Sequence, residues 1–484
     1  MYLGLDLGTS GLKAMLVDDD FATVAVAHAA LTVTRPHPGW SEQDPAEWIA
    51  AAEDVLGQLR ARHPDALARL RGIGLSGHMH GAVLLDAADQ VLRPCILWND
   101  SRAAAQCETL TARADFHRIG GNLVMAGFTA PKLLWVAEQE PEIFERTARV
   151  LLPKDYLRLW LTGEHMSEMS DAAGTLWLDV GARDWSDDLL AATGLSRAQM
   201  PGLVEGSDVS GHLRGDLARA WGTPARVPVA GGAGDNAATA CGMGVMTPGT
   251  GFLSLGTSGV LFAASDHYQP NTGDAVHSFC HAVPETWHQM GVILSASDSL
   301  SWLAEVTGTT VPDLAAAMPQ QITAPARPTF LPYLSGERTP LNDPAAAGAL
   351  LGLRRDVDRA ELVQAVMEGV ALAFADCVRV LGVAGSGLEA AYAVGGGARS
   401  RPWLELMAAI TGLRLLLPQD GDFGAAFGAA KLAAAAALDR TDAELFSAPA
   451  IAAEIAPDPQ LAARYAEKAA LYRAAYPALK GIGA

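Results

Sequence analysis

The pentapeptide Leu-Gly-Thr-Ser-Gly occurs twice in this chain, at residues 7–11 and 255–259. Each copy stands between two short apolar runs, so each predicts a strand, a tight turn and a second strand paired as a hairpin. Glycine tolerates unusual backbone angles, and consecutive amide N–H groups can receive phosphate oxygens. The repeat therefore predicts a fold of two similar halves, each with a turn suited to phosphate.

The two hairpins differ at the residue just before the pentapeptide. Asp6 precedes the first copy, whereas Ser254 precedes the second. Only the first hairpin therefore offers a carboxylate that could hold a divalent cation beside phosphates. The alternative is that Asp6 only caps the turn; the duplication favours the metal role.

Composition narrows the class of protein. The chain has 484 residues, of which 50% are hydrophobic and 18% charged, as in globular proteins with a large core. A net charge of −19 without a basic run makes nucleic acid an unfavourable partner. The five scattered cysteines indicate a reducing compartment. Neither a signal peptide nor a membrane-spanning apolar stretch is evident, so we expect a cytoplasmic protein without membrane contact.

Strand and helix patterns alternate along the chain, which predicts an α/β fold. Asp44, Pro45 and Glu47 form a helix-start signal before apolar residues at helical spacing over 48–59. Buried strands are expected at 72–76, 227–230 and 391–394, and helices at 361–381 and 424–438. The stretch 103–224 is mostly helical in pattern and carries no obvious catalytic motif. A domain boundary is expected near residue 245.

A glycine-rich turn at residues 231–234 leads into Asp235 and Asn236. A carboxylate at such a place could accept the proton of a hydroxyl group, and phosphoryl transfer needs little more from a side chain. Asp235 as the N-cap of a helix over 236–243 is about equally compatible with the sequence. Asn236 is either a substrate hydrogen-bonder or part of the same cap.

Three other segments carry polar residues with more than one interpretation. His78 and His80 could be metal ligands, packed histidines or part of a polyol pocket, and without a third ligand the metal interpretation is weak. Residues 98–102 contain Trp98, Asp100 and Arg102, either as a structured Asp–Arg pair or as a solvated turn. Glycines 395–397 could border an adenine or simply connect a strand to a helix.

Together these segments resemble the FGGY carbohydrate kinases, within the actin/Hsp70/sugar-kinase superfamily. Residues 6–10 and 255–258 are similar to the two phosphate motifs of that family, 232–236 to the segment with the catalytic Asp, and 394–400 to the adenosine motif. The loop at 77–81 resembles the sugar loop of the xylulokinase branch, where glycerol kinases typically place an Arg-Glu pair. His78 stands where that branch often has Gln.

The resemblance implies two RNase H-like α/β domains with an interdomain cleft: residues 1–245 for sugar and catalysis, and 246–484 for ATP, with the last helices able to pack on the first domain. It implies Asp235 as general base and Asp6 as the Mg²⁺ ligand, through water. The implied sugar contacts are Met79, His80, Trp98, Asp235 and Asn236, and the implied ATP contacts are Gly8, Thr9, Ser10, Lys13, Gly256, Thr257, Gly396 and Gly397.

The implied reaction is phosphorylation of D-xylulose to D-xylulose 5-phosphate in pentose catabolism, with Mg-ATP as donor. The expected partners are these small molecules, without nucleic acid or membrane, and a homodimer is an open alternative to a monomer. Rival interpretations are a kinase for ribulose, fuculose or glycerol and, from another class, a non-catalytic sugar or nucleotide sensor.

Overall fold

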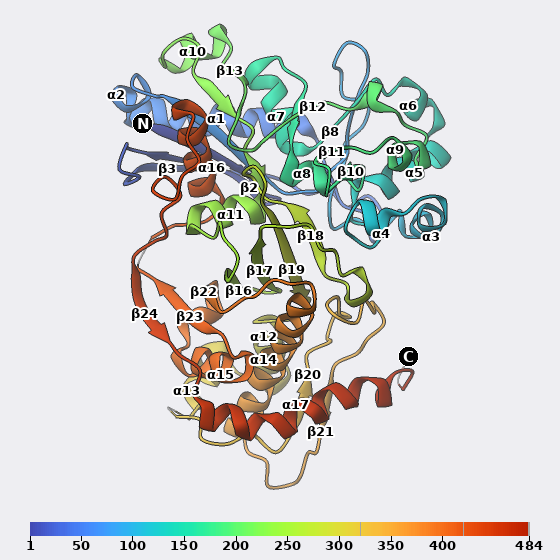
Figure 1. Cartoon of the computed structure of the whole chain (residues 1–484), viewed down its shortest axis with the longest axis vertical. Coiled ribbons are helices and arrows are strands. Elements are labelled where there is room, and N and C mark those ends of the chain that lie inside the picture. Colours follow the sequence, from blue (N-terminus) through green and yellow to red (C-terminus); the bar gives the residue numbers. More distant parts are fainter. Residues whose placement is uncertain (320, 420, 483–484) are drawn as a thin grey trace.

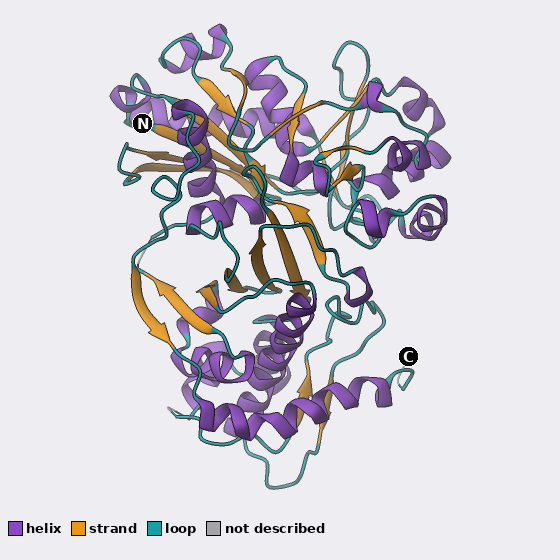
Figure 2. Ribbon diagram, viewed as in Figure 1, coloured by secondary structure: helices purple, strands orange, loops and turns teal. Residues whose placement is uncertain are grey.

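The computed structural model describes residues 1–319, 321–419 and 421–482. Figure 1 shows two bodies, each built around one sheet, and Figure 2 shows helices flanking both groups of strands. We call them the first and second domains. The predicted α/β class is confirmed. No helix within the described ranges is both long and apolar enough to cross a bilayer.

The first sheet has a mixed strand order. Its strands β1, β2 and β3 are antiparallel neighbours, while β5 and β14 extend the sheet parallel to β1. In spatial order the strands are β13 (Val209–His212), β14 (Pro228–Ala230), β5 (Gly72–Gly77), β1 (Tyr2–Leu7), β2 (Gly11–Val17) and β3 (Thr23–Ala30), with β15 (Ala233–Gly234) also paired to β5.

The second sheet repeats this pairing. Strands β16 and β17 form the second predicted hairpin, β19 continues it antiparallel, and β22 and β23 add to β16 in parallel. The order is β18 (His277–Cys280), β19 (Trp287–Ile293), β17 (Gly259–Ser265), β16 (Thr250–Leu255), β22 (Ala390–Val394), β23 (Arg414–Pro418) and β24 (Ile451–Ile455). The duplication predicted from the pentapeptides is thus a duplication of topology.

Alternation along the strands distributes apolar side chains between two layers in each domain. Leu3, Leu5 and Leu7 of β1 pack with the helices on one face of the first sheet, whereas Tyr2 packs on the other. The helices on these faces are α1 (Pro45–Arg62), α2 (Pro64–Leu67), α7 (Pro153–Thr162) and α10 (Gly215–Trp221) on the first, and α11 (Asp235–Met243) and α16 (Ala425–Leu438) on the second. The predicted start of α1 is confirmed, because Asp44 accepts from Ala46 N at 2.9 Å.

Helix α16 comes late in the sequence but lies on the first sheet, among the blue strands of Figure 1. The contact is close enough to require glycine in the strands. A Cβ on Gly4 would stand 1.9 Å from the Ala426 oxygen, and one on Gly74 would stand 1.8 Å from the Ala429 oxygen. The last helix, α17 (Pro459–Leu479), instead packs in the core of the second domain.

The other helices of the second core are α12 (Asp298–Thr307), α13 (Val311–Ala317), α14 (Arg359–Val383) and α15 (Arg401–Thr411). A helical region follows β7 in the first domain: α3 (Ala104–Arg113), α4 (Phe116–Ile119), α5 (Thr129–Gln139), α6 (Pro141–Arg146), α8 (Met169–Ala173) and α9 (Asp187–Ala192). Small paired strands complete the chain: β4 (Glu42–Gln43) with β7 (Cys95–Ile96), β6 (Val83–Leu85) with β8 (Arg149–Leu151), β9 (Met166–Glu168) with β12 (Gly202–Val204), β10 (Leu178–Asp179) with β11 (Asp184–Trp185), and β20 (Thr329–Leu331) with β21 (Ala349–Leu351).

Candidate active site

The first sheet brings Asp6 and Asp235 to the same edge. In the register, Asp6 of β1 stands opposite Ser76 of β5, and Ser76 stands opposite Ala233 of β15. Asp235 follows β15 directly, as the first residue of α11. Because these three strands are parallel, the acids leave the sheet at the same end although most of the first domain separates them in sequence.

The two carboxyl groups influence each other. Burial raises the pKa of Asp235 to about 6, and the negative charge of Asp6 adds to this effect. Burial also raises the pKa of Asp6, against the opposing influence of the nearby Ser76 hydroxyl and the Lys13 ammonium. Asp235 is therefore ionised at neutral pH but holds a proton more tightly than an ordinary aspartate, as a general base requires.

Asp235 does not cap its helix. The N-cap of α11 is Gly234, and Asp235 lies inside the first turn. The Asp235 Oδ1 atom accepts from the Asn236 backbone N at 2.8 Å and from its side-chain Nδ2 at 3.0 Å. The helix-cap alternative is thus wrong, and Asn236 orients the carboxylate beside it.

The turn before Asp235 depends on glycine. Gly232 has a φ of +75°, and a Cβ there would lie 2.1 Å from the Leu75 oxygen. A Cβ on Gly231 would lie 2.2 Å from the Glu205 oxygen. We call residues 231–235 the catalytic turn. Its bare backbone fits against β5 and the segment after β12, which places Asp235 at the sheet edge.

The first phosphate turn is fastened from outside. Gln43 Nε2 donates to the Thr9 oxygen at 2.7 Å, and Trp98 Nε1 donates to Thr9 Oγ1 at 3.0 Å. Among the described residues, the backbone N–H groups of Thr9 and Ser10 donate to no protein acceptor. Free amides at a rigid turn fit phosphate oxygens. Trp98, half exposed at 48%, thus borders this turn.

The second phosphate turn is held similarly. The Gly256 oxygen accepts from the backbone N of Ser297 at 2.9 Å and from its hydroxyl at 2.6 Å, and the Thr257 oxygen accepts from Ala296 N at 2.8 Å. Ser254 of β16 pairs with Val394 of β22, so glycines 395–397 follow at the neighbouring strand end. A Cβ on Gly395 would stand 2.7 Å from the Leu255 oxygen.

Two glycines of the expected adenosine border differ in exposure. Gly396 is exposed, and a Cβ at this position would have no neighbouring atom within 4 Å, whereas Gly397 is buried against Leu255 and Trp403. Gly396 therefore offers an open backbone surface beside the second phosphate turn. Gly397 instead fixes the approach of the two strand ends.

Lys13 is the residue whose expected contact with ATP differs most from its surroundings in the structure. It stands opposite Asp6 in the hairpin, and its ammonium is ion-paired with Asp422. This pair joins the first hairpin to the segment before α16. An ATP contact would require Lys13 to exchange or share this partner.

The expected sugar loop lies against the catalytic turn. Met79 is buried, and a Cβ on Gly234 would stand 2.8 Å from its Cγ atom. His80 has a left-handed φ of +72°, its ring lies 4.4 Å from that of Phe128, and its Nδ1 is 2.6 Å from the Gly174 oxygen. Met79 and His80 thus share one region with Asp235.

The remaining alternatives from the sequence are also decided. Asp100 and Arg102 form a buried pair at 2.7 Å, with the guanidinium 3.6 Å above the Trp40 ring, so the solvated-turn interpretation is wrong. His78 packs edge-on against Trp48, at 5.9 Å between ring centres. No three His, Cys, Asp or Glu side chains gather as a metal site in the part of the chain that the structure describes.

The helical stretch that seemed without chemistry supplies the support of both loops. Lys132 Nζ donates to the His80 oxygen at 2.7 Å and to the Gly127 oxygen at 2.8 Å. Arg158 and Ser170 contact the catalytic turn. A signal was present in the sequence, because charged residues stand within the apolar clusters around 132–136 and 151–160, but their partners lie far away in the chain.

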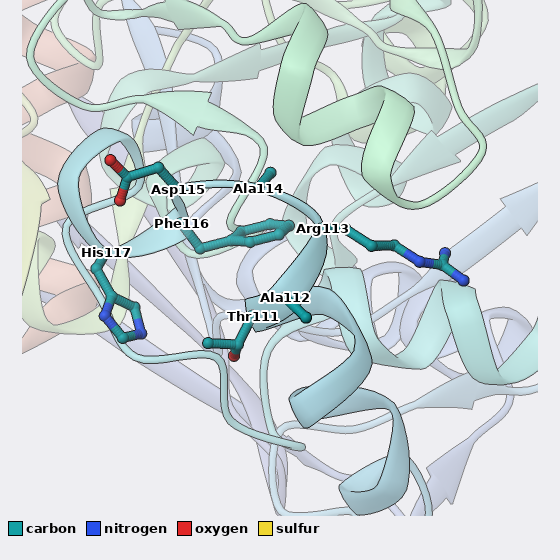
Figure 3. Close-up of a pocket in the computed structure, with 7 residues that line it drawn as sticks. All are labelled: Thr111, Ala112, Arg113, Ala114, Asp115, Phe116 and His117. Atoms are coloured by element: carbon teal, nitrogen blue, oxygen red, sulfur yellow. The ribbon is translucent and has the colours of Figure 1, made fainter.

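One hollow lies apart from these residues. Figure 3 shows it between the end of α3 and the start of α4, lined by residues 111–117, with a volume of about 330 Å³. All its lining comes from one short surface segment, and none of the candidate site residues contributes. The strand-end geometry described above therefore locates the candidate site, and this hollow does not.

Comparison with known proteins decides the family. A family model for the N-terminal domain of FGGY carbohydrate kinases matches residues 1–242, and a model for the C-terminal domain matches residues 251–437. This chain belongs to the FGGY family of carbohydrate kinases. It is therefore a carbohydrate kinase, and the predicted enzyme class is confirmed.

The similarity of this FGGY kinase to individual relatives spans almost the whole chain. It is 50% identical over 480 residues to the xylulose kinase of Escherichia coli K12, covering 98% of each chain. The structure is similar to a xyloylose kinase from Brucella ovis, with 55% identity and a TM-score of 0.98, and to a xylulose kinase from Rhodospirillum rubrum, with 31% identity and a TM-score of 0.93; each match covers 99% of both chains. The predicted pair of RNase H-like domains of the actin/Hsp70/sugar-kinase type is confirmed.

Proposed function

We propose that this FGGY kinase transfers the γ-phosphoryl group of ATP to D-xylulose and forms D-xylulose 5-phosphate in pentose catabolism. The observation that carries the proposal is the meeting of Asp6 and Asp235 at one sheet edge, beside the loop of Met79 and His80. The near full-length similarity to proteins named xylulose kinases supports the choice of sugar.

Asp235 acts as the general base in this proposal. Its carboxylate accepts the proton of the terminal sugar hydroxyl, whose oxygen then attacks the γ-phosphorus. Asn236 keeps Oδ1 oriented through its two hydrogen bonds. Met79, His80 and Asn236 line the sugar site, and Trp98 forms a wall between the sugar and the first phosphate turn. Closing the domains over a cleft excludes water and limits hydrolysis of ATP.

Asp6 is suited to Mg²⁺. It is a partly buried carboxylate at the start of an amide-lined turn, and Mg²⁺ favours one or two protein carboxylates together with waters and phosphate oxygens. When bound, Mg²⁺ neutralises negative charge on the phosphates. Asp6 holds the ion through water, and its own negative charge raises the basicity of Asp235.

The two turns and the glycine border bind ATP. Free amides of Thr9 and Ser10 receive phosphate oxygens from one side, and Gly256 and Thr257 receive them from the other. Gly8 allows the tight first turn, and Lys13 approaches the phosphates from β2. The exposed backbone of Gly396, with Gly397 behind it, borders the adenosine.

A coupled assay of ADP release tests the activity, with Mg-ATP and D-xylulose, D-ribulose, L-ribulose, L-fuculose or glycerol, and a blank without sugar. We expect the highest kcat/KM with D-xylulose. Asp235→Asn keeps the shape of the site, so it should bind sugar within about tenfold of wild type and lose most of kcat. Preferred turnover of another sugar would replace the substrate. Binding of ATP and sugar without any sugar phosphate would favour a sensor.

We further propose that the enzyme works in the cytoplasm, where its ATP is available, and as a homodimer. Light scattering at several protein concentrations tests the second point. A mass of about twice the 50.5 kDa of the chain would support a dimer, and a mass equal to that of one chain would exclude it.

A further inference from the structure

Behind the catalytic turn lies a group of charged and polar side chains that is sealed from solvent. We call it the support network. Its members are all essentially without exposed surface: Lys154, Asp155, Arg158, Ser167, Glu168, Ser170 and Asp171. They come from α7, β9 and α8, elements in which the sequence carried no obvious catalytic motif. Buried charges persist only where they are paired and hydrogen-bonded.

The network is internally paired. Lys154 Nζ lies 2.8 Å from Asp155, 3.2 Å from Glu168 and 3.1 Å from Asp171. Arg158 lies 2.6 Å from Asp155. Two positive and three negative groups would leave one excess charge. Burial raises the pKa of Asp171 to about 8, with the neighbouring carboxylates adding to this effect, so a proton on Asp171 balances the group at neutral pH.

Two members reach out to the catalytic turn. Arg158 donates to the Gly231 oxygen at the start of the turn, and Ser170 Oγ accepts from Gly234 N at 3.1 Å. The second contact is one peptide unit from Asp235. Since glycines at 231, 232 and 234 give the turn little stiffness of its own, contacts from outside must hold it.

Ser170 is itself held in one orientation. Its hydroxyl donates to the Glu168 carboxylate, with Oγ–O distances of 2.9 and 3.1 Å, which leaves its lone pairs for the Gly234 N–H. Glu168 also accepts from the backbone N of Ser170 at 2.7 Å and from that of Asp171 at 2.9 Å. A hydrogen bond polarised by a buried carboxylate is stronger and better defined than a neutral one.

We propose that Ser170, fixed by Glu168, is a positioning residue that holds Gly234 and thereby sets the place of the Asp235 carboxylate. This inference rests on the proposed role of Asp235 as general base. Displacing a base by about 1 Å lowers the rate about a hundredfold without altering the binding contacts. Loss of the Ser170 hydroxyl should therefore act on kcat more than on either KM.

The chain offers a matched control. Ser167 belongs to the same network and is equally buried, and its hydroxyl donates to Asp155 Oδ2 at 2.6 Å. It does not contact the catalytic turn among the described residues. Ser167→Ala and Ser170→Ala thus each remove one buried hydroxyl bonded to a buried carboxylate, and only the second frees the Gly234 N–H.

The experiment compares both variants with wild type in kcat, in KM for D-xylulose and ATP, and in the pH dependence of kcat. We expect Ser170→Ala to lower kcat about 10- to 100-fold with both KM values within about threefold. The acid limb of its pH profile should move to lower pH, because a looser turn exposes the Asp235 carboxylate to water. Ser167→Ala should keep kcat within about threefold and leave the acid limb in place.

Equal loss of kcat in both variants, or an unmoved acid limb in Ser170→Ala, would overturn the inference and leave a purely structural network. Ser170→Thr retains the hydroxyl and should recover at least part of kcat; no recovery in a folded variant would also count against it. Urea unfolding of each variant separates misfolding from mispositioning. Asp235→Asn distinguishes the levels, because wild-type kcat in that variant refutes the proposed base, whereas an inactive Asp235→Asn with an active Ser170→Ala refutes only the role of Ser170.

Discussion

Lys132 and Lys154 stand behind the two loops of the candidate site, and both are completely buried. Lys132 supports the sugar loop through two backbone oxygens and has no carboxylate within ion-pair distance in the described part of the chain. Lys154 belongs to the network behind the catalytic turn and contacts three carboxylates. The same residue type therefore supports one loop by hydrogen bonds and the other by charge.

The consequence is an opposite shift of the two pKa values. Burial lowers the pKa of Lys132 to about 7, because nothing nearby compensates fully for the lost hydration. Burial also acts to lower the pKa of Lys154, but Asp155, Asp171 and Glu168 outweigh it and raise the pKa. A buried lysine thus stays charged only where carboxylates surround it. The sugar loop is held by a cation that can lose its charge, the catalytic turn by a fixed one.

The largest effect is expected for Lys154→Met. The substitution keeps the length of the side chain but leaves buried carboxylates without their cation, which costs about 3–5 kcal/mol of unfolding free energy. Urea unfolding at neutral pH measures it. Lys154→Arg, which keeps the charge, is the control and should lose less. A loss below about 1 kcal/mol in Lys154→Met would contradict the role of fixed charge.

Lys132→Met should affect substrate binding more than global stability. It removes the donor to the His80 and Gly127 oxygens, so the left-handed His80 loses support. We expect KM for D-xylulose to rise about tenfold, the equivalent of one or two hydrogen bonds, with KM for ATP within about twofold. An equal rise of both KM values would show a general loss of structure instead.

The pH dependence of stability should separate the two lysines. Lys132 titrates near pH 7 when folded and near 10.5 when unfolded, so the unfolded chain binds one more proton between these values. Its contribution therefore makes the unfolding free energy rise with pH in this window. Lys132→Met should lose that one-proton slope. Lys154, with its raised pKa, gives no such slope there, and an unchanged slope in Lys132→Met would show that Lys132 stays charged when folded.

Thr129→Val should have the smallest effect. Thr129 Oγ1 donates to the same His80 oxygen as Lys132, but at 3.2 Å and as a neutral group. Valine keeps the branched shape and leaves Lys132 in place. We expect KM for D-xylulose to rise by less than about threefold, without a change in the pH slope of stability. An effect as large as that of Lys132→Met would assign the support to Thr129.

Much of the framework was predictable because its signals are local. The repeated pentapeptide predicted both hairpins, and Asp44 with Pro45 predicted the start of α1. Local sequence could not decide whether Asp235 caps its helix. That depended on Gly234 taking the cap position, which follows from the tight approach of the catalytic turn to β5.

The duplicated topology, the glycine turns and the candidate acids could all be read from the amino-acid sequence, since each depends on residues within a few positions of one another. The support behind them became visible only in the folded chain. Lys132, Glu168 and Ser170 look like ordinary polar residues of a helical stretch, and their roles arise because β5 and β15 bring distant loops onto that stretch. The pKa of a buried group depends on the three-dimensional arrangement of its partners, which no local pattern records.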